Sequence, residues 1–317
     1  KRNLLEWTTS EEAERNSKND VGSYYKNMFI NVIAGVIICA ISYKFKDLVS
    51  FIIGIMWIVA PFAMCNISKT KGKKDAVDYL SNNEKDFCIE IASKTFQFFK
   101  DNLTIENNYL IPDNYQYDRK KEYVDRTSST NIGLSLLAIV SGIDLNFISK
   151  EEGIELLKNM LNSIESLEKW HGHLYNWYDI KTKKPLYPRY ISTVDSGNFI
   201  GYLFVLKVYL IGLEDEFDCI KDLIEIITNM IDNAEFSYLY SEKNRLFSIG
   251  FNIEENKLTD SYYDLLASEA RQASFIAIAK KDVPTKHWNC LNRTLTILNN
   301  RKGLISWSGT AFEYMMP

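Results

Sequence analysis

The stretch STVDSGNFIGYLFVLKVYLIG, residues 192–212, starts with small polar residues and then becomes apolar on all sides. It lacks the single apolar stripe of a surface helix, so we expect a buried helix with a polar start. Similar polar starts occur at residues 127–133, 260–264 and 306–310. Amphipathic segments with acidic residues near their starts, such as 150–157 and 215–231, alternate with them. The sequence therefore predicts two kinds of helix in alternation.

Alternating buried and amphipathic helices are typical of an α/α toroid, in which an outer ring of helices covers an inner ring. We expect an all-α fold with helices near 75–103, 129–143, 150–169, 194–212, 216–235, 261–280, 284–298 and from about 309. Inner-helix N-termini carry free N–H groups, and polar side chains gathered there suit the rim of a ligand cavity. Each polar start alone also fits a simple N-cap, but four in alternation favour a site.

Two apolar segments precede this region, MFINVIAGVIICAISY at 28–43 and LVSFIIGIMWIVAPFAMCNI at 48–67, and neither contains a charged residue. Each approaches the roughly 20 residues that cross a hydrocarbon core of about 30 Å. The connector at 44–47 allows only a tight turn. We therefore expect residues 24–74 to form a transmembrane helical hairpin in a lipid bilayer. A buried hairpin of a soluble protein is the alternative, but apolar residues cover every face of both segments.

Basic residues indicate the orientation of this hairpin. Those that flank its outer ends are Arg15, Lys18, Lys26, Lys69, Lys71, Lys73 and Lys74, whereas the connector has only Lys44 and Lys46. Basic residues gather on the cytoplasmic side of a membrane, so we expect both flanks and everything after the hairpin in the cytoplasm. Residues 1–20 are polar, and we expect residues 1–23 to be a linker from a missing upstream domain, with an interfacial helix as the alternative. Both ends of the chain look cut.

The composition excludes several classes of function. A net charge of −4 gives no broad attraction to nucleic acid, so no nucleic-acid partner is expected. Five scattered cysteines without a CxxC pair indicate a reducing compartment and neither a disulfide framework nor a zinc site. His171 and His173 have no evident third ligand, so no metal is expected. No cofactor is expected either, and the GxSxG, GxxxxGK[ST] and GxGxxG motifs are absent from the sequence.

The densest group of aromatic and polar residues runs from WHGHLYNWYD at 170–179 through KPLYPRY at 184–190 to STVDSGN at 192–198. Aromatic faces bind the C–H faces of sugar rings, and His, Asp, Asn and Arg side chains hydrogen-bond to sugar hydroxyls. This mixture predicts a carbohydrate subsite.

Glycoside chemistry usually needs two carboxylates on opposite sides of the scissile bond. Glu269 lies one turn beyond Asp264 on the helix expected at 261–280, among small or apolar neighbours. A buried carboxylate is costly to keep charged, so it must be paired or functional. The spacing fits a structural ion pair with Arg271 equally well. Asp195 and Glu313 have similar settings.

At these segments the chain resembles the cyclic β-1,2-glucan synthases, large bacterial membrane proteins with a glycosyltransferase region, several membrane spans and a glucoamylase-like cyclization domain. The similar stretches are RTSSTNIG at 126–133, LEKWHGHLYNWY at 167–178, YPRYISTVDSGN at 187–198, YDLLASEAR at 263–271 and ISWSGTAFEY at 305–314. They keep a consistent order, and the resemblance covers residues 24–317, including the hairpin. Ser129 departs from the family, which usually has proline at that position.

The resemblance implies that residues 75–317 are the N-terminal part of an (α/α)6 barrel, truncated at its C-terminus, in the bacterial inner membrane. Its substrate would be linear β-1,2-glucan, and UDP-glucose would be used only by the missing upstream domain. Glu269 matches one of two catalytic carboxylates, and the other would lie beyond Pro317. The implied substrate-binding residues are Arg126, Thr127, His173, Tyr187, Arg189, Asp195, Tyr263, Asp264, Trp307 and Glu313.

Closing a glucan into a ring without loss to water requires a shielded glycosyl intermediate, which the far-end hydroxyl of the same glucan captures. That reaction is retaining transglycosylation, with Glu269 as nucleophile or as acid/base. The alternatives are a β-1,2-glucan phosphorylase, a glucanase-like glycosidase, or a noncatalytic glucan-binding module. With a single catalytic carboxylate, the fragment alone is expected to be inactive.

Overall fold

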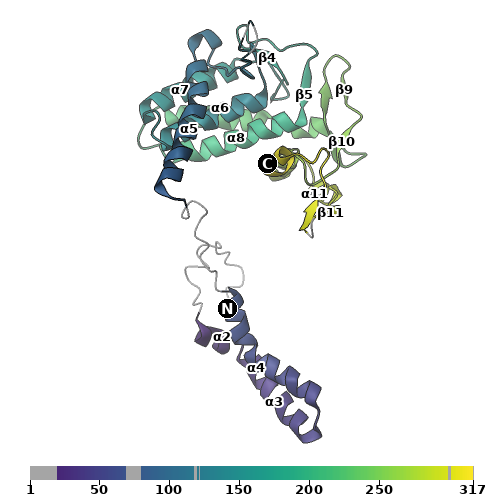
Figure 1. The fold of residues 1–317 in the computed structure, drawn as a ribbon. Coiled ribbons are helices and arrows are strands. Elements are labelled where there is room, and N and C mark those ends of the chain that lie inside the picture. The colour runs from purple at the N-terminus through teal and green to yellow at the C-terminus, as the bar shows by residue number, and fades with distance from the viewer. Residues whose placement is uncertain (1–19, 69–79, 118–119, 121, 299–300, 317) are drawn as a thin grey trace. The chain divides into compact units, whose positions relative to one another are not determined.

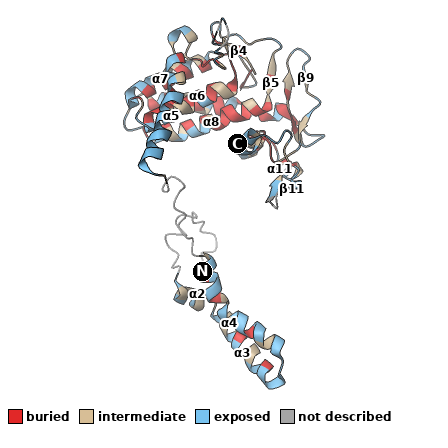
Figure 2. Cartoon of the chain, viewed as in Figure 1, coloured by how far each residue is buried: buried red, intermediate tan, exposed pale blue. Residues whose placement is uncertain are grey.

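A computed structural model of the chain describes residues 20–68, 80–117, 120, 122–298 and 301–316. The chain divides into two compact units, Lys1–Lys85 and Asp86–Pro317. Figure 1 shows the elements of both units, and Figure 2 shows how far each described residue is buried.

The first unit is a helical hairpin. The hairpin, in the described part of this unit, contains α2 (Val21–Asn27), α3 (Phe29–Phe45) and α4 (Leu48–Ser68). A left-handed residue, Lys46, ends α3. The Asp47 carboxylate then accepts hydrogen bonds from the Val49 N–H at 3.1 Å and the Ser50 hydroxyl at 2.5 Å, which satisfies free donors at the start of α4. The connector is therefore the tight turn that the sequence predicts.

Small residues bring α3 and α4 into close contact. A Cβ atom added at Gly35 would lie 2.7 Å from the Gly54 carbonyl oxygen, and one added at Gly54 would lie 2.5 Å from Cys39 Sγ. Close backbone approach through glycine is a common way for helices to associate in membranes, where apolar burial gives little driving force. Most apolar side chains on the outside of the hairpin are exposed (Figure 2).

By length and composition, α4 is apolar enough to cross a membrane, with a mean hydropathy of 2.3. The α2 and α3 helices meet this criterion together, although the chain bends by 73° between them. A helix of the second unit, α8 (Thr193–Ile211), also meets it with a mean hydropathy of 1.3, but half of that window is buried inside the protein. Among the described helices, the hairpin helices α3 and α4 combine apolar length with apolar side chains that are exposed along most of their surface, which is consistent with a membrane protein.

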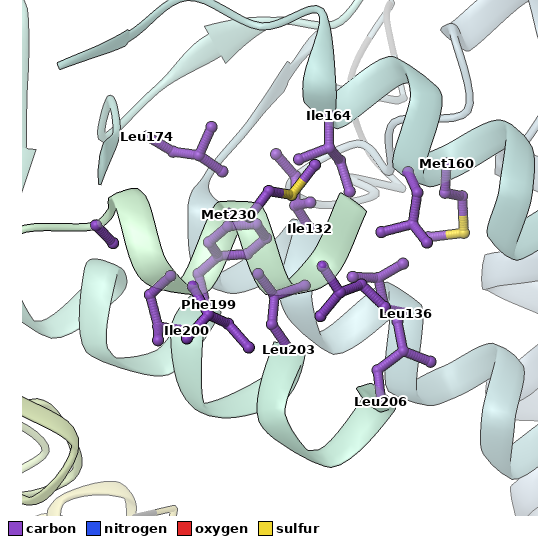
Figure 3. Packing of buried hydrophobic residues seen from close by; sticks show 14 of the residues in the cluster. Ile132, Leu136, Met160, Ile164, Leu174, Phe199, Ile200, Leu203, Leu206 and Met230 are labelled. Atoms are coloured by element: carbon purple, nitrogen blue, oxygen red, sulfur yellow. The ribbon is translucent and has the colours of Figure 1, made fainter. Parts of the chain in front are cut away.

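Two kinds of helix alternate in the second unit, as the sequence predicts. α6 (Ser129–Asp144) and α8 are mainly apolar, whereas α7 (Lys150–Glu165) and α9 (Ile220–Asn233) are amphipathic. Figure 3 shows their shared core, where apolar residues from all four helices interdigitate. α5 (Asn82–Asn102) and α10 (Arg271–Lys280) complete the set of longer helices. The all-α fold class is confirmed.

Short antiparallel strands, each two to four residues long, connect the helices. β1 (Arg126–Thr127) pairs with β4 (Tyr178–Asp179), and β2 (Lys169–Trp170) pairs with β3 (His173–Leu174). β5 (Tyr190–Ser192), β8 (Gly250–Asn252) and β9 (Lys257–Leu258) form one sheet, and β6 (Tyr240–Ser241), β7 (Leu246–Ser248) and β10 (Tyr262–Tyr263) form another. Two 3₁₀ turns, η2 (Ile105–Asn107) and η3 (Phe236–Leu239), lie between these elements. In Figure 1, β5 leads directly into the N-terminal end of α8.

Two helix predictions are wrong. The helix expected at 261–280 begins only at Arg271, because Tyr262 and Tyr263 pair with β7 and the segment 264–270 is irregular. The helix expected at 284–298 is reduced to α11 (Lys286–Cys290), and β11 (Leu295–Leu298) forms a hairpin with β12 (Arg301–Leu304). β-Branched residues in β11, Thr296 and Ile297, favour the extended strand.

The other expected helices are present with shifted ends. The helix expected at 150–169 ends at Glu165, since residues 169–170 form β2. The last expected helix is the short α12 (Ala311–Met315), which the Thr310 side chain caps. Residues 75–79 of the first expected helix lie outside the described residues.

Candidate active site

The candidate site lies where the N-terminal ends of α6 and α8 meet the start of α10. A glycine allows the close approach of α8 and α10, because a Cβ atom at Gly197 would lie 2.4 Å from the Cβ and 2.6 Å from the Cα of Ala273. This contact brings the first turn of α8 beside the segment 264–270. As a result, Asn198 of α8 and Glu269 are within hydrogen-bonding distance.

Four side chains from these elements form one hydrogen-bonded chain. Asn198 Nδ2 donates to Glu269 Oε1 at 2.9 Å and to Thr130 Oγ1 at 3.1 Å. The Thr130 hydroxyl donates to Asp195 Oδ1 at 2.6 Å. The chain therefore joins two carboxylates, Asp195 and Glu269, through an amide and a hydroxyl. We call these four residues the Asp195–Glu269 relay.

The surroundings of Glu269 raise the pKa of its carboxyl group. Burial raises the pKa of the Glu269 carboxyl, and the negative charges of Asp195 and Glu313 raise it further. The hydrogen bond from Asn198 acts in the opposite direction, but the net effect is a raised pKa. A carboxyl group whose pKa moves toward neutrality is suited to proton transfer in catalysis.

Two tyrosines lie within the electrostatic influence of these carboxylates. Burial, reinforced by the charges of Glu269 and Asp195, raises the pKa of Tyr202 to about 12. The same causes raise the pKa of Tyr263, and a further small contribution comes from Tyr190. Both phenols therefore stay neutral at pH 7 and keep a proton that they can donate to a ligand.

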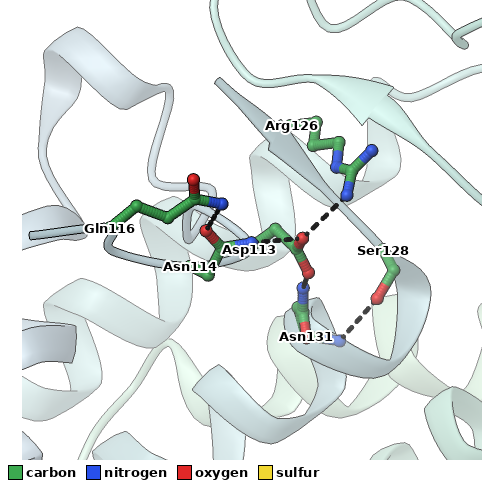
Figure 4. Close-up of polar contacts among 6 residues, drawn as sticks. All are labelled: Asp113, Asn114, Gln116, Arg126, Ser128 and Asn131. Atoms are coloured by element: carbon green, nitrogen blue, oxygen red, sulfur yellow. Dashed lines mark hydrogen bonds and ion pairs between the residues drawn. The ribbon is translucent and has the colours of Figure 1, made fainter. Parts of the chain in front are cut away.

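Beside α6, a second cluster surrounds Asp113 (Figure 4). Its carboxylate accepts from Arg126 Nη2 at 3.2 Å and from Asn131 Nδ2 at 2.8 Å. The Arg126 guanidinium also stacks 4.1 Å from the ring centroid of Trp177. Asn131 is in the first turn of α6, where Ser128 caps the helix. The cluster fixes an aromatic ring and a cation beside the helix end.

Asn176 connects this aromatic ring to the relay. With its amide oriented so that both atoms have partners, Asn176 Nδ2 donates to Asp195 Oδ2 at 3.2 Å and its oxygen accepts from Trp177 Nε1 at 3.1 Å. Both oxygens of Asp195 therefore accept hydrogen bonds from the protein.

Trp307, Asp264 and Tyr263 meet near the C-terminal end of the described chain. Trp307 Nε1 donates to Asp264 Oδ1 at 3.2 Å, and the ring centroids of Trp307 and Tyr263 are 5.9 Å apart. The Trp307 side chain is 53% exposed, so its ring is accessible to a ligand. An exposed indole held by a hydrogen bond is a suitable surface for a sugar ring.

Glu313 serves as a local cap. Its carboxylate accepts from the Ser306 and Ser308 hydroxyls at 3.1 and 2.7 Å and from the Thr310 backbone N–H at 3.1 Å. Partial burial raises the pKa of Glu313, but these hydrogen bonds outweigh it and lower the pKa to about 2. The carboxylate is therefore ionised and holds the loop before α12.

The remaining predicted binding residues lie in other surroundings. His173 is 2% exposed and packs against Phe236, and burial lowers its pKa to about 4, so it is neutral at pH 7. Thr127 is fully buried on β1. Arg189 is paired with Glu254 at 2.9 Å and lies 5.4 Å from the ring of Tyr187, whose side chain is 77% exposed.

The predicted position of Glu269 on a helix is wrong, because it lies in the irregular segment between β10 and α10. Arg271, its suggested structural partner, is oriented with Nη2 3.5 Å from the Tyr314 carbonyl oxygen. Sequence reasoning missed Thr130, Asn198, Asn176 and Tyr202 as individual residues. The first two belong to the polar starts TSSTNIG and STVDSGN, but the sequence does not show that they face each other. Among the described residues, no group of three or more His, Cys, Asp or Glu side chains is placed to hold a metal ion.

Comparisons with known proteins agree with the predicted resemblance. No family model matches the chain. The chain is 26% identical to the cyclic β-(1,2)-glucan synthase NdvB of Rhizobium meliloti over 99% of its own length, and it spans 16% of that protein. This result confirms the similarity to a cyclic glucan synthase.

Two solved structures show the fold. An endo-β-1,2-glucanase from Chitinophaga pinensis, in complex with sophorotriose and glucose, matches with a TM-score of 0.59 and 18% identity over 71% of this chain and 56% of that one. A protein from Bacteroides caccae assigned as a glucoamylase matches with a TM-score of 0.60 and 17% identity, over 72% of this chain and 59% of that one. The helical barrel fold is thereby confirmed, and the chain spans less than two thirds of either structure.

Proposed function

We propose that this chain, which resembles a cyclic β-1,2-glucan synthase over nearly its whole length, is part of such a synthase and closes linear β-1,2-glucan into a ring. The similarity to NdvB supports the substrate and the product. The fold shared with an endo-β-1,2-glucanase supports a barrel that handles the same glucan. In this proposal residues 24–74 anchor the protein in the bacterial inner membrane and residues 75–317 form the first part of the barrel on the cytoplasmic side.

The setting of Glu269 is the observation that carries the proposal. Its carboxyl group has a raised pKa, accepts a hydrogen bond from Asn198 and lies at the meeting point of the inner-helix ends. Trp307, hydrogen-bonded to Asp264, offers an exposed ring in the same part of the fold. A held carboxyl group and an accessible indole are two of the elements that a glycoside-processing site uses, beside a second carboxyl group.

In one assignment of the proposed reaction, Glu269 acts as the nucleophile in its ionised form, which the hydrogen bond from Asn198 stabilises. Its oxygen attacks the anomeric carbon, and the glycosidic bond breaks as a second carboxyl group protonates the leaving oxygen. The far-end hydroxyl of the same glucan then attacks the anomeric carbon, releases Glu269 and returns its proton to the second carboxylate. The number of glycosidic bonds is unchanged. In the alternative assignment, Glu269 is the acid/base and the other carboxylate is the nucleophile.

The second carboxylate is proposed to lie in barrel helices beyond Pro317, and UDP-glucose is proposed to be used by a domain upstream of the hairpin. The solved structures extend well beyond the part that this chain matches. We call the chain together with the proposed rest of its barrel and the proposed upstream domain the complete protein.

The test is Glu269→Gln in the complete protein, with linear β-1,2-glucan as substrate and ring formation followed by mass spectrometry. Gln keeps the shape and can still accept the hydrogen bond from Asn198, but it can neither attack an anomeric carbon nor exchange a proton. Turnover should fall at least about 100-fold, while glucan affinity stays near wild type and the melting temperature does not fall below that of wild type. The control is Glu216→Gln, which removes an exposed carboxylate paired with Lys150 and should leave turnover unchanged.

Other outcomes identify the alternatives. Near-normal ring formation by a stable Glu269→Gln protein would rule out catalysis by this residue. A joint loss of stability, affinity and turnover would indicate a structural role. Phosphate-dependent release of glucose 1-phosphate by the wild type would indicate a phosphorylase, open-chain products a glycosidase, and binding without turnover a noncatalytic module.

A further inference from the structure

The direction of each hydrogen bond in the Asp195–Glu269 relay follows from counting protons. The Thr130 hydroxyl has one proton, which it donates to Asp195 Oδ1 at 2.6 Å. Asp195 accepts a second hydrogen bond, from Asn176, on its other oxygen. With its proton used in this way, Thr130 can only accept from Asn198. The nitrogen of the Asn198 amide must therefore face Thr130, and that nitrogen also faces Glu269.

The opposite orientation of the Asn198 amide is disfavoured for a definite reason. It would place Oδ1 3.1 Å from Thr130 Oγ1, whose proton is already committed, and two acceptors would face each other. It would also place Oδ1 beside Glu269, where only a protonated carboxyl could bond to it. The observed orientation leaves Asn198 Oδ1 without a partner among the described residues, although the side chain is fully buried. The relay outweighs that cost.

We propose that Asn198 is a positioning residue for Glu269, and that Thr130 and Asp195 hold its amide in the donating orientation. Asn198 touches Glu269 and not the reacting atoms, so it acts through that carboxyl group. It fixes one oxygen, Oε1, and leaves Oε2 as the atom available for chemistry. The catalytic consequence rests on the proposed function, whereas the orientation itself does not.

The relay also limits how far the pKa of Glu269 rises. Burial and the charges of Asp195 and Glu313 raise its pKa, and the Asn198 N–H lowers it by stabilising the carboxylate. The phenols of Tyr202 and Tyr263, whose pKa values the charge of Glu269 helps to raise, are neutral at pH 7. Removing the donor, or freeing the amide to rotate, leaves only the raising influences. The titration of Glu269 should then move to higher pH, whichever catalytic role it has.

The experiment measures this titration in the complete protein by carbodiimide labelling of Glu269, read at the single residue by peptide mass spectrometry across a pH series. Labelling falls as the carboxyl group loses its proton, so the midpoint reports the pKa. Asn198→Ala removes the donor. Thr130→Val removes the hydroxyl at constant shape, and Thr130→Ser restores it. Ser196→Ala is the matched control, because Ser196 lies in the same turn of α8, is buried, and its hydroxyl has no partner among the described residues.

We expect the labelling midpoint to rise in Asn198→Ala and Thr130→Val and to stay at the wild-type value in Thr130→Ser and Ser196→Ala. Turnover at neutral pH should fall about 10-fold or more in the first two variants, as for the loss of a hydrogen bond to a charged group. The limb of the pH–rate profile that reports the titration of Glu269 should shift to higher pH together with the labelling midpoint.

An unchanged midpoint in Thr130→Val would overturn the proposal, as would an equal shift in Thr130→Ser and Thr130→Val. If Asn198→Ala fails to fold, the Thr130 pair still decides, since it changes one hydroxyl. The outcome is separable from that of the proposed function. A shifted midpoint in a protein whose Glu269→Gln variant keeps full turnover would leave the positioning of Glu269 standing and remove its catalytic meaning.

Discussion

Substituting Gly197 by alanine should separate the two halves of the candidate site with a single methyl group. The new Cβ would lie 2.4 Å from Ala273 Cβ, 2.6 Å from its Cα and 2.8 Å from its backbone nitrogen. Two of these atoms belong to the backbone of Ala273, and the third is its methyl carbon, which cannot rotate away. The strain can therefore be relieved only if α10 and the segment before it move away from α8.

The required movement is worked out from these distances. Ordinary contact begins at 3.4 Å, so the start of α10 must shift by about 1 Å. Such a shift would lengthen the 2.9 Å hydrogen bond between Asn198 and Glu269 to about 3.9 Å, beyond hydrogen-bonding range. Overpacking costs about 1–3 kcal/mol, partly offset by about 1 kcal/mol from the better helix propensity of alanine. A misplacement of about 1 Å at a reacting group can cost about 100-fold in rate.

The assay compares melting temperature, the labelling midpoint of Glu269 and ring formation in the complete protein. Gly201→Ala is the matched control, one turn further along α8. Its added Cβ would meet the end of the flexible Gln272 side chain at 2.1 Å, which can rotate away. We expect a large loss of turnover with a small loss of stability in Gly197→Ala, and neither in Gly201→Ala. Wild-type turnover and an unchanged midpoint in Gly197→Ala would refute the argument that this close contact sets the site.

The hairpin and the titration of Glu269 give three further predictions. The chain should stay with the membrane pellet after alkaline carbonate extraction, and recovery in the supernatant would contradict the membrane assignment. Gly35→Leu should open the contact between α3 and α4, because the new Cβ atom would lie 2.7 Å from the Gly54 carbonyl oxygen. Chemical labelling of the Cys39 thiol should then increase. Val36→Leu, at an exposed position of the same helix, is the control. The pKa of Glu269 is raised in the folded protein, so the wild type loses stability as pH rises from the ordinary value of 4.5 through the raised value. The melting temperature of Glu269→Gln minus that of wild type should therefore be larger at about pH 7 than at about pH 4. The same difference at both pH values would argue against the raised pKa.

The parts of the fold that depend on local apolar pattern were predictable. Uncharged segments of near-membrane length predicted α3 and α4. The stretch STVDSGN followed by an apolar run predicted α8, and the amphipathic segment near residue 150 predicted α7. In each case the residues that form the element also carry its pattern within one stretch of sequence.

The region after residue 260 was predicted less well because its structure depends on distant partners. Tyr262 and Tyr263 form a strand only because β7 is available to pair with them, and the segment 264–270 is held by bonds such as that from the Asn292 N–H to the Asp264 carbonyl oxygen. The polar residues at 260–264 and the apolar residues after them do not tell from the sequence whether the helix begins at 260 or at 271. Tertiary pairing decides between the two, and local propensity does not.

The site itself shows what a sequence pattern leaves undetermined. Glu269 and Asp195 were both recognisable as carboxylates in unusual surroundings, but their coupling depends on Asn198 and Thr130, which belong to different helices and are 68 residues apart in the sequence. Apart from the glycine before it, nothing near Asn198 in the sequence distinguishes it from an ordinary polar residue of a helix start. The role of Asn198 depends on Gly197, whose lack of a side chain allows Ala273 to lie close to α8. It also depends on the single proton of the Thr130 hydroxyl, which sets the orientation of the Asn198 amide. A polar residue next to a glycine at the start of an apolar helix is therefore the local signal to examine, since glycine permits the close helix contact across which such a residue can bond.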